Sequence, residues 1–306
     1  MKEIVCKLLV IGAGPGGYVC AIRAGQLGVD TVIVEKTKAG GTCLNVGCIP
    51  SKALIHAAEE FDRLRHTAGL NALGITVETP RLDLAQTVRW KDGIVGRLNS
   101  GVLGLLRKAK VKIVHGAARF RDGKTVEVET ETGTQLIRAE TVVIATGSEP
   151  VELPALPFGG AVLSSTGALS LPEVPKSLAV VGGGYIGLEL GTAFAKLGAR
   201  VTVVEAMAQI LPQYDGELVK PVAKRLGELG VRVLTGAKAK GYSGEALAVE
   251  IAGKEERIAA DKVLVTVGRR PRTEGWGLEE LDLDRAGRFI RIDDQCRTSM
   301  RGVFAI

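Results

Sequence analysis

Two stretches of the chain, residues 7–36 and 177–206, carry the same pattern of apolar and polar positions. Each begins with a short apolar run, passes through a glycine-rich turn and continues with apolar positions at helical spacing. Each then ends in a second apolar run that is followed by an acid. This order predicts strand, turn, amphipathic helix and strand, which is the dinucleotide-binding βαβ unit. We therefore expect an α/β fold with two interleaved Rossmann-like domains.

The residues that carry chemistry repeat along with the pattern. In such a unit the first glycine makes the tight turn, the second lets the backbone approach the pyrophosphate, and the third lets the helix pack on the strand. The free N–H groups at the helix start receive the phosphates, and the terminal acid accepts hydrogen bonds from the ribose hydroxyls. The first copy supplies Gly12, Gly14, Gly17 and Glu35, and the second supplies Gly182, Gly184, Gly187 and Glu205.

One such glycine pattern is weak evidence, because glycine-rich turns are common. Two copies, each in a complete strand–turn–helix–strand–acid context, are strong evidence for two bound dinucleotides. Two dinucleotides imply electron transfer between two redox cofactors.

The remaining segments place these two units in separate domains. Residues 52–66 and 83–110 have helical patterns, whereas 111–145 and 231–267 are rich in short strand patterns. The proline-rich connector EPVELPALP (149–157) precedes the second unit. The predicted domains are a first dinucleotide-binding domain over 1–149, a second over 150–272, and a segment over 273–306 that returns to the first.

Cys43 and Cys48 lie five residues apart in GGTCLNVGCIPSK (40–52), at the start of a helical pattern. Five residues of ideal helix advance about 7.5 Å, which exceeds the ~7 Å that a disulfide can span. A bond between the two would therefore require a distorted backbone, and a strained disulfide is easily reduced. A structural disulfide would add little to a chain with large cores, and no further ligands complete a metal site. The motif favours redox chemistry and no metal, whereas Cys6, Cys20 and Cys296 are expected to be packing thiols.

Composition narrows the function classes. The net charge is +6, but the basic residues are spread along the chain and aromatic residues make up only 4%. Without a motif that reads DNA or RNA, nucleic-acid binding is not expected. No apolar run approaches the ~20 residues of a membrane span, and the N-terminal run lacks the form of a signal peptide. We expect no membrane association and a cytoplasmic location.

Together the motifs resemble the pyridine-nucleotide–disulfide oxidoreductases over the whole chain. Within that family, GGTCLNVGCIPSKAL is most similar to the lipoamide dehydrogenases, and ATGS (145–148), GGGYIGLELG (182–191) and VGRRP (267–271) extend the likeness. The resemblance implies a glutathione-reductase-like fold, with FAD bound by the first domain and NAD by the second.

The resemblance also implies a role for each motif residue. Cys43 would exchange with dihydrolipoamide, Cys48 would form a charge-transfer contact with the flavin, and Lys52 would pair with Glu189 near flavin N5. The residues expected to hold FAD are Gly12, Gly14, Gly17 and Glu35 at its ADP half, Gly41, Thr42 and Lys52 along the flavin, and Gly116, Thr146, Gly147 and Ser148. The residues expected to hold NAD are Gly182, Gly184, Ile186, Gly187 and Glu205, with Tyr185 gating the nicotinamide pocket and Gly268 lining it.

Glu205 favours NAD over NADP. No Arg or Lys occurs from Ala206 to Tyr214 to receive a 2′-phosphate. A carboxylate about 4 Å from that phosphate would cost on the order of 4 kcal/mol at an effective dielectric of 20.

The function implied is oxidation of dihydrolipoyl groups, with electrons passing to a Cys43–Cys48 disulfide, then to FAD and then to NAD. The expected partners are lipoyl domains of 2-oxoacid dehydrogenase or glycine-cleavage complexes, and the full-length protein is expected to be a homodimer. Two alternatives stay open. One is a mercuric or low-molecular-weight disulfide reductase that runs from NAD(P)H, and the other is a protein that binds FAD or NAD without turnover.

The end of the chain differs from the family pattern. Members continue with a Gly-Asp pair that binds the flavin, the rest of the central domain, and an interface domain that carries a His–Glu base. His56, His66 and His115 do not fit that role and are expected to be packing or surface residues. We therefore expect a fragment that lacks the interface domain and is inactive alone.

Overall fold

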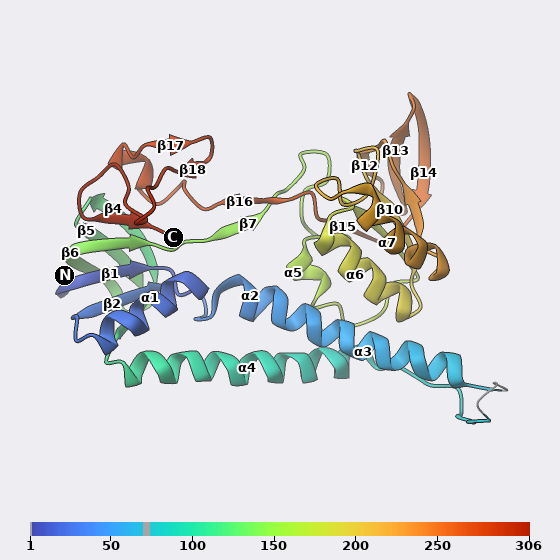
Figure 1. Ribbon diagram of the computed structural model, residues 1–306, viewed down its shortest axis with the longest axis horizontal. Coiled ribbons are helices and arrows are strands. Elements are labelled where there is room, and N and C mark those ends of the chain that lie inside the picture. The colour runs from blue at the N-terminus through green and yellow to red at the C-terminus, as the bar shows by residue number, and fades with distance from the viewer. Residues whose placement is uncertain (1, 70–73) are drawn as a thin grey trace. The chain divides into compact units, whose positions relative to one another are not determined.

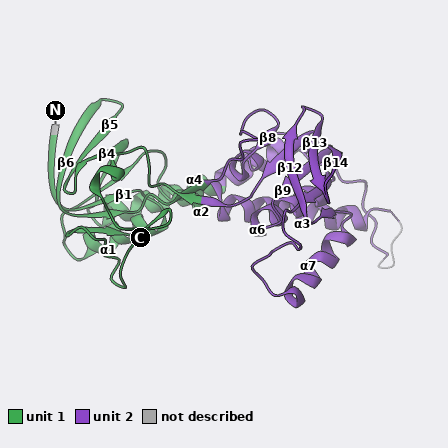
Figure 2. Ribbon diagram, turned by 90° about the horizontal axis from the view of Figure 1, so that it is seen from above, with its two compact units in different colours: residues 1–45, 94–149, 270–306 green, residues 46–93, 150–269 purple. Residues whose placement is uncertain are grey.

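The computed structural model describes residues 2–69 and 74–306 (Figure 1). By internal contacts the chain divides into two units (Figure 2). Unit 1 comprises 1–45, 94–149 and 270–306, and unit 2 comprises 46–93 and 150–269. The chain thus passes between the units several times. Residues 46–93 group with unit 2, whereas the sequence placed them in the first domain.

Unit 1 is built on a sheet with the strand order β3-β2-β1-β6-β5-β4. The strands from β3 to β6 run parallel, β5 and β4 form antiparallel neighbours, and β19 pairs with β6. The strands are β1 Lys2–Ile11, β2 Thr31–Glu35, β3 Lys112–His115, β4 Ala117–Asp122, β5 Thr125–Thr130, β6 Gly133–Ile144 and β19 Val303–Ala305. The other elements are α1 Pro15–Gln26, α2 Gly41–Val46, α4 Leu84–Lys108, which begins in unit 2, η1 Leu278–Leu281, β17 Arg285–Ala286 and β18 Phe289–Ile290.

Both faces of this sheet are covered, because successive side chains of a strand point to opposite faces. Leu9 and Ile11 of β1 lie in one apolar cluster, and Val10 lies in the other. Helix α4 contributes Val102 and Leu106 to the second cluster. Leu9, Val10 and Ile11 of β1 are therefore consecutive buried apolar residues, as a strand covered on both faces requires.

Unit 2 is built on a parallel sheet with the strand order β11-β10-β9-β15-β8, and an antiparallel sheet β12-β13-β14. The strands are β8 Val162–Leu163, β9 Ser177–Val181, β10 Arg200–Val204, β11 Arg232–Leu234, β12 Ala237–Tyr242, β13 Ala246–Ile251, β14 Lys254–Ala259 and β15 Lys262–Val265. The helices are α3 Cys48–Thr67, α5 Ser165–Ala168, α6 Tyr185–Lys196 and α7 Gly216–Glu228. Two short strands, β7 Ser148–Pro150 and β16 Arg269–Pro271, pair with each other where the chain passes between the units.

The two parallel sheets share one local order. In unit 1 the strand that follows the helix lies beside the strand before it, β2 next to β1, with β6 on the other side. In unit 2 β10 lies next to β9 in the same way, with β15 on the other side. This arrangement confirms the predicted α/β class with two Rossmann-like units. No helix within the described ranges 2–69 and 74–306 is long and apolar enough to cross a membrane.

Candidate functional site

The glycine-rich turn of unit 1 connects β1 to α1 and has no room for side chains. Gly12 has a φ of +102°, and a Cβ there would lie 2.3 Å from the carbonyl oxygen of Ala145. A Cβ on Gly17 would lie 1.9 Å from the carbonyl oxygen of Gly12. Both distances are far below van der Waals contact, so only glycine allows α1 to pack this closely on the strands.

The turn of unit 2 connects β9 to α6 and repeats this geometry. Gly182 also has a φ of +102°, and a Cβ there would lie 2.6 Å from the carbonyl oxygen of Thr266. A Cβ on Gly187 would lie 2.4 Å from the carbonyl oxygen of Gly182. Gly14 and Gly184 are the N-caps of α1 and α6, and neither helix start has a side-chain cap hydrogen bond. Such helix N-termini are suited to phosphate groups.

The two acids make matching hydrogen bonds. Oε2 of Glu35 accepts from the backbone N–H of Ala13 at 2.8 Å, and Oε1 accepts from that of Thr37 at 2.8 Å. Oε2 of Glu205 accepts from Gly183 at 2.6 Å, and Oε1 accepts from Met207 at 2.7 Å. Each acid therefore ties its own glycine-rich turn to the end of the second strand.

Sequence reasoning assigned these acids to ribose hydroxyls and missed their backbone partners. The signal was present, because Ala13 and Gly183 occupy the same place in the repeat, as do Thr37 and Met207. A carboxylate has about four acceptor positions, so two backbone bonds leave capacity for a ribose. The ribose contacts stay a prediction.

Several of the other residues expected to hold FAD lie around the first turn. A Cβ on Gly41 would lie 2.4 Å from Cα of Gly14, so these two backbones are in close contact. The N–H of Gly116 donates to the carbonyl of Glu35 at 3.0 Å. Cα of Thr146 lies 3.3 Å from the position of a Cβ on Gly12.

Other residues expected to hold FAD lie in the same unit. The carbonyl of Gly147 accepts from the N–H of Arg272 at 3.0 Å, and Oγ1 of Thr146 donates to the carbonyl of Arg272 at 2.9 Å. Thr42 lies in α2 and Ser148 begins β7. All of these residues belong to unit 1. Their role toward FAD stays a prediction.

The two cysteines of the CxxxxC motif lie on different helices. Cys43 is in α2, and Cys48 is the first residue of α3, where it is exposed. The helical path is interrupted between them at Gly47, which has φ −134° and ψ −114°. The backbone thus departs from an ideal helix in this segment, as a bond between the cysteines would require. The disulfide and its redox role stay predictions.

Lys52 and Glu189 meet within unit 2. Nζ of Lys52, on α3, lies 2.7 Å from both carboxylate oxygens of Glu189, on α6. Cys48 is four residues before Lys52 and therefore on the same side of α3. Glu189 is four residues after Tyr185, the first residue of α6. The expected ion pair is thus present, and it connects the helix that Cys48 begins to the helix that follows the second glycine-rich turn.

The remaining residues expected at NAD differ in exposure. Tyr185 is 61% exposed at the start of α6, whereas Ile186 is partly buried and packs against the core of unit 2. Gly268 has a φ of +133°, and its carbonyl accepts from the N–H of Val151. Ile186 thus contributes packing at the helix start, while the Tyr185 side chain is available for a ligand.

Among residues 2–69 and 74–306 no group of three or more His, Cys, Asp or Glu side chains could hold a metal ion. Nδ1 of His66 lies 2.8 Å from the carbonyl oxygen of Asp62, and the ring of His56 lies 6.3 Å from that of Trp90.

The family model described as pyridine nucleotide-disulphide oxidoreductase matches residues 6–306. The chain belongs to the pyridine nucleotide-disulphide oxidoreductases. Among curated members, the chain is 60% identical to the dihydrolipoyl dehydrogenase of Pseudomonas aeruginosa, over 100% of this chain and 67% of that protein. It is 48% identical to the dihydrolipoyl dehydrogenase of Geobacillus stearothermophilus, over 99% of this chain and 65% of that protein.

Two solved structures of related proteins match this chain over nearly its whole length. The HOCl-induced flavoprotein disulfide reductase RclA of Escherichia coli, in its Cu(II) complex, superposes with a TM-score of 0.86 at 26% identity, over 100% of this chain and 66% of that one. LpdA of Mycobacterium tuberculosis superposes with a TM-score of 0.86 at 25% identity, over 98% and 67%. The chain spans about two thirds of the length of the relatives it matches.

These similarities confirm the family predicted from the sequence and its fold class. They also confirm, at the level of the family, the predicted oxidoreductase of the flavoprotein disulfide type and its cofactors FAD and NAD.

Proposed function

We propose that this chain is the FAD- and NAD-binding part of a dihydrolipoyl dehydrogenase, with FAD in unit 1 and NAD in unit 2. The observation that carries the proposal is the Lys52–Glu189 ion pair. It connects α3, which begins at Cys48, to α6, which begins directly after the second glycine-rich turn. A redox cysteine and a nucleotide-binding turn are thereby held by one pair of helices. The 60% identical relative, a dihydrolipoyl dehydrogenase, supports this choice of substrate.

The proposed reaction transfers two electrons from a dihydrolipoyl group to NAD. One dihydrolipoyl thiolate attacks Sγ of Cys43 and breaks the Cys43–Cys48 bond, so that Cys48 leaves as a thiolate. The second dihydrolipoyl sulfur then displaces Cys43 and closes the lipoyl disulfide, which leaves both electrons on the cysteine pair. Overall, dihydrolipoyl and NAD⁺ give lipoyl, NADH and one proton.

Residues of both units would serve this transfer. When bound in unit 1, FAD supplies the chemistry that carries electrons from the cysteine pair to the nicotinamide. Lys52 would offer a positive charge held in place by Glu189, and Tyr185 would cover the nicotinamide pocket until NAD enters. The glycine-rich turns would receive the two pyrophosphates at helix N-termini.

The proposal extends to partners and location. We propose that lipoyl domains of 2-oxoacid dehydrogenase or glycine-cleavage complexes deliver the substrate, that the full-length protein is a homodimer, and that it is cytoplasmic. The names of the curated relatives support the lipoyl substrate.

The test compares the two cysteines in the full-length protein. Two-electron reduction should produce a long-wavelength absorption band from a thiolate next to the flavin. Cys48→Ser should abolish the band, whereas Cys43→Ser should show it without reductant, and both should lose dihydrolipoamide-dependent NAD reduction. Identical behaviour of the two variants would overturn the assignment of the sulfurs. If the wild-type protein reduces mercuric ion or a small disulfide but does not oxidise dihydrolipoamide, the proposed substrate is wrong.

A further inference from the structure

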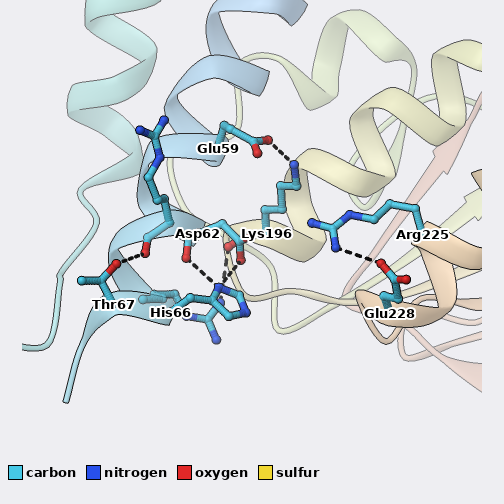
Figure 3. Close-up of polar contacts among 9 residues, drawn as sticks. Glu59, Asp62, His66, Thr67, Lys196, Arg225 and Glu228 are labelled. Atoms are coloured by element: carbon cyan, nitrogen blue, oxygen red, sulfur yellow. Dashed lines mark hydrogen bonds and ion pairs between the residues drawn. The ribbon is translucent and has the colours of Figure 1, made fainter. Parts of the chain in front are cut away.

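Helices α3 and α6 share a second ion pair beyond Lys52–Glu189. Nζ of Lys196 donates to Oε2 of Glu59 (Figure 3). Glu59 follows Lys52 by seven residues, and Lys196 follows Glu189 by seven. Seven residues are close to two helical turns, so both pairs lie on the facing sides of the two helices. The charges are reversed in order: α3 carries the cation first and α6 carries the anion first.

The ammonium of the second pair is more buried than that of the first, while its partner Glu59 is 51% exposed. The side chain of Lys196 is 11% exposed, whereas that of Lys52 is 60% exposed. Side chains between the two pairs, Ala58 on α3 and Ala193 on α6, belong to one core with exposed fractions of 0% and 1%. Small side chains at these buried positions leave room for the two helix backbones to approach each other.

The end of α6 is fixed to α3 by a further contact. Nη1 of Arg65 donates to the carbonyl of Lys196, the last residue of α6, at 3.3 Å. A cation at a helix C-terminus is favourable because it meets the negative end of the helix dipole. The pKa of the Glu59 carboxyl is lowered, chiefly by the hydrogen bond from Lys196 and further by the charges of Lys196, Arg225 and Arg63. Glu59 is thus a partly exposed anion with three cationic side chains nearby.

Exposed ion pairs contribute little to stability. A mostly buried ammonium is different, because it is costly unless a partner of opposite charge is in place. Any rotation or sliding of α3 along α6 would separate Lys196 from Glu59 and leave that charge unpaired. The pair therefore selects one register between the helices, and that register brings Lys52 to Glu189.

We propose that Glu59 and Lys196 are positioning residues, which hold α3 in register on α6 and thereby fix the direction of Cys48 and Lys52. The readouts of this proposal rest on the proposed function. Cys48, Lys52 and Glu59 follow one side of α3, so the position of Glu59 determines where the two residues at the reacting end point. Glu59 and Lys196 act through the helix and contact neither substrate nor cofactor.

The test uses full-length, FAD-loaded protein and four variants. Lys196→Met removes the charge and keeps the length of the side chain, and Glu59→Gln keeps the shape of its partner. The double variant Glu59→Lys with Lys196→Glu restores a pair of reversed sign. Lys240→Met is the matched control, because it removes another Lys–Glu pair of unit 2, Lys240–Glu250 at 3.0 Å between β12 and β13.

The proposal predicts a split between kcat and KM. Lys196→Met and Glu59→Gln should lower kcat about 10-fold to 100-fold, the loss expected from a displacement of about 1 Å at the reacting groups. The KM for NAD should stay unchanged, because the glycine-rich turn and Glu205 are intact. The long-wavelength band of the two-electron-reduced protein should weaken with kcat, and the reversed pair should restore most of both. Lys240→Met should change neither.

The outcomes separate this inference from the proposed function. If wild type shows neither band nor turnover, the proposed function fails. If wild type shows both and Lys196→Met and Glu59→Gln retain them, the positioning role is wrong. Equal loss of band in these variants and in Lys240→Met, or no recovery in the reversed pair although it is folded by circular dichroism, would also overturn it.

Discussion

The glycine-rich turns of unit 1 and unit 2 have the same geometry, but the segments that follow them differ. In both, the first glycine has a φ of +102° and the terminal acid accepts from the N–H of the residue after that glycine. The chain then returns to the turn in both units, since the N–H of Gly40 donates to the carbonyl of Ala13 and that of Leu211 to Gly183. From there the two units diverge.

In unit 1 the returning segment is Gly40-Gly41, which touches Gly14 and leads directly into α2 and Cys43. In unit 2 it is Leu211, with a φ of +49°, and the space beside Gly184 is open. Glu205 is also more buried than Glu35. The shared part is imposed by packing a helix on a strand, whereas the segments that return to the two turns differ.

The largest expected effect concerns the choice of nucleotide at unit 2. We predict a preference for NAD over NADP of at least about a hundredfold in kcat/KM, because the Glu205 carboxylate would repel a 2′-phosphate. Glu205→Ala should reduce the preference without creating strong NADP use, since removing repulsion supplies no phosphate partner. Steady-state kinetics of the full-length protein measures this. Equal use of both nucleotides by wild type would refute the role of Glu205.

Substitution of the third glycine of each turn by alanine should destabilise the protein to a similar extent in the two units. Gly17→Ala and Gly187→Ala place a Cβ against backbone oxygens, so each should lower the free energy of unfolding by about 1–3 kcal/mol or more. Gly101→Ala is the control in α4, where a Cβ meets nothing within 4 Å. It should stabilise by roughly 0.5–1 kcal/mol. Urea unfolding compares the three, and a neutral Gly17→Ala would show that the packing of α1 is looser than described.

Alkaline pH should weaken unit 1 through a thiol that unit 2 lacks. Burial, with a smaller contribution from Asp30, raises the pKa of the Cys6 thiol from 9.0 to about 11, and the corresponding residue of unit 2 is Lys176. Between about pH 9 and 11 the folded state keeps a proton that the unfolded chain has lost. The free energy of unfolding should therefore fall across this window, by roughly 2 kcal/mol.

Cys6→Ala isolates this contribution. The variant loses the titrating group. The unfolding free energy of wild type minus that of the variant should therefore fall as the pH rises through that window. A constant difference from pH 8 to 11 would contradict the buried state of the thiol.

The smallest effect on stability is expected at the Lys52–Glu189 pair. Both side chains are more than a third exposed, so Lys52→Met should change the free energy of unfolding by less than about 1 kcal/mol. The same variant should lower turnover strongly, because the proposed role of Lys52 is at the flavin. A variant that is destabilised and retains turnover would reverse this assignment.

The sequence predicted the parts of the molecule that depend on local pattern. The repeat located both turns, and the helical patterns over 52–66 and 83–110 correspond to α3 at Cys48–Thr67 and α4 at Leu84–Lys108. The Lys52–Glu189 contact was expected from the family resemblance alone. It could not follow from spacing, because its two residues are 137 positions apart.

What the sequence did not provide depends on tertiary register. Nothing in the pattern around Glu59 distinguishes it from an ordinary surface acid of an amphipathic helix, since its partner Lys196 is defined only once α3 lies on α6. The grouping of residues 46–93 with unit 2 has the same origin: Leu54 and Ala58 belong to the core that contains Phe194. Contacts between distant helices decide such assignments.

The most direct test of the account is hydrogen exchange with each dinucleotide in turn. FAD should slow exchange of backbone amides at 12–17 and 35–37, and NAD should slow it at 182–187 and 205–207, with neither protecting the other turn. Glu35→Gln and Glu205→Gln should each weaken protection only in their own unit. Protection of a single turn by both dinucleotides, or of neither turn by either, would contradict the claim that the chain holds two different dinucleotides at two turns of one design.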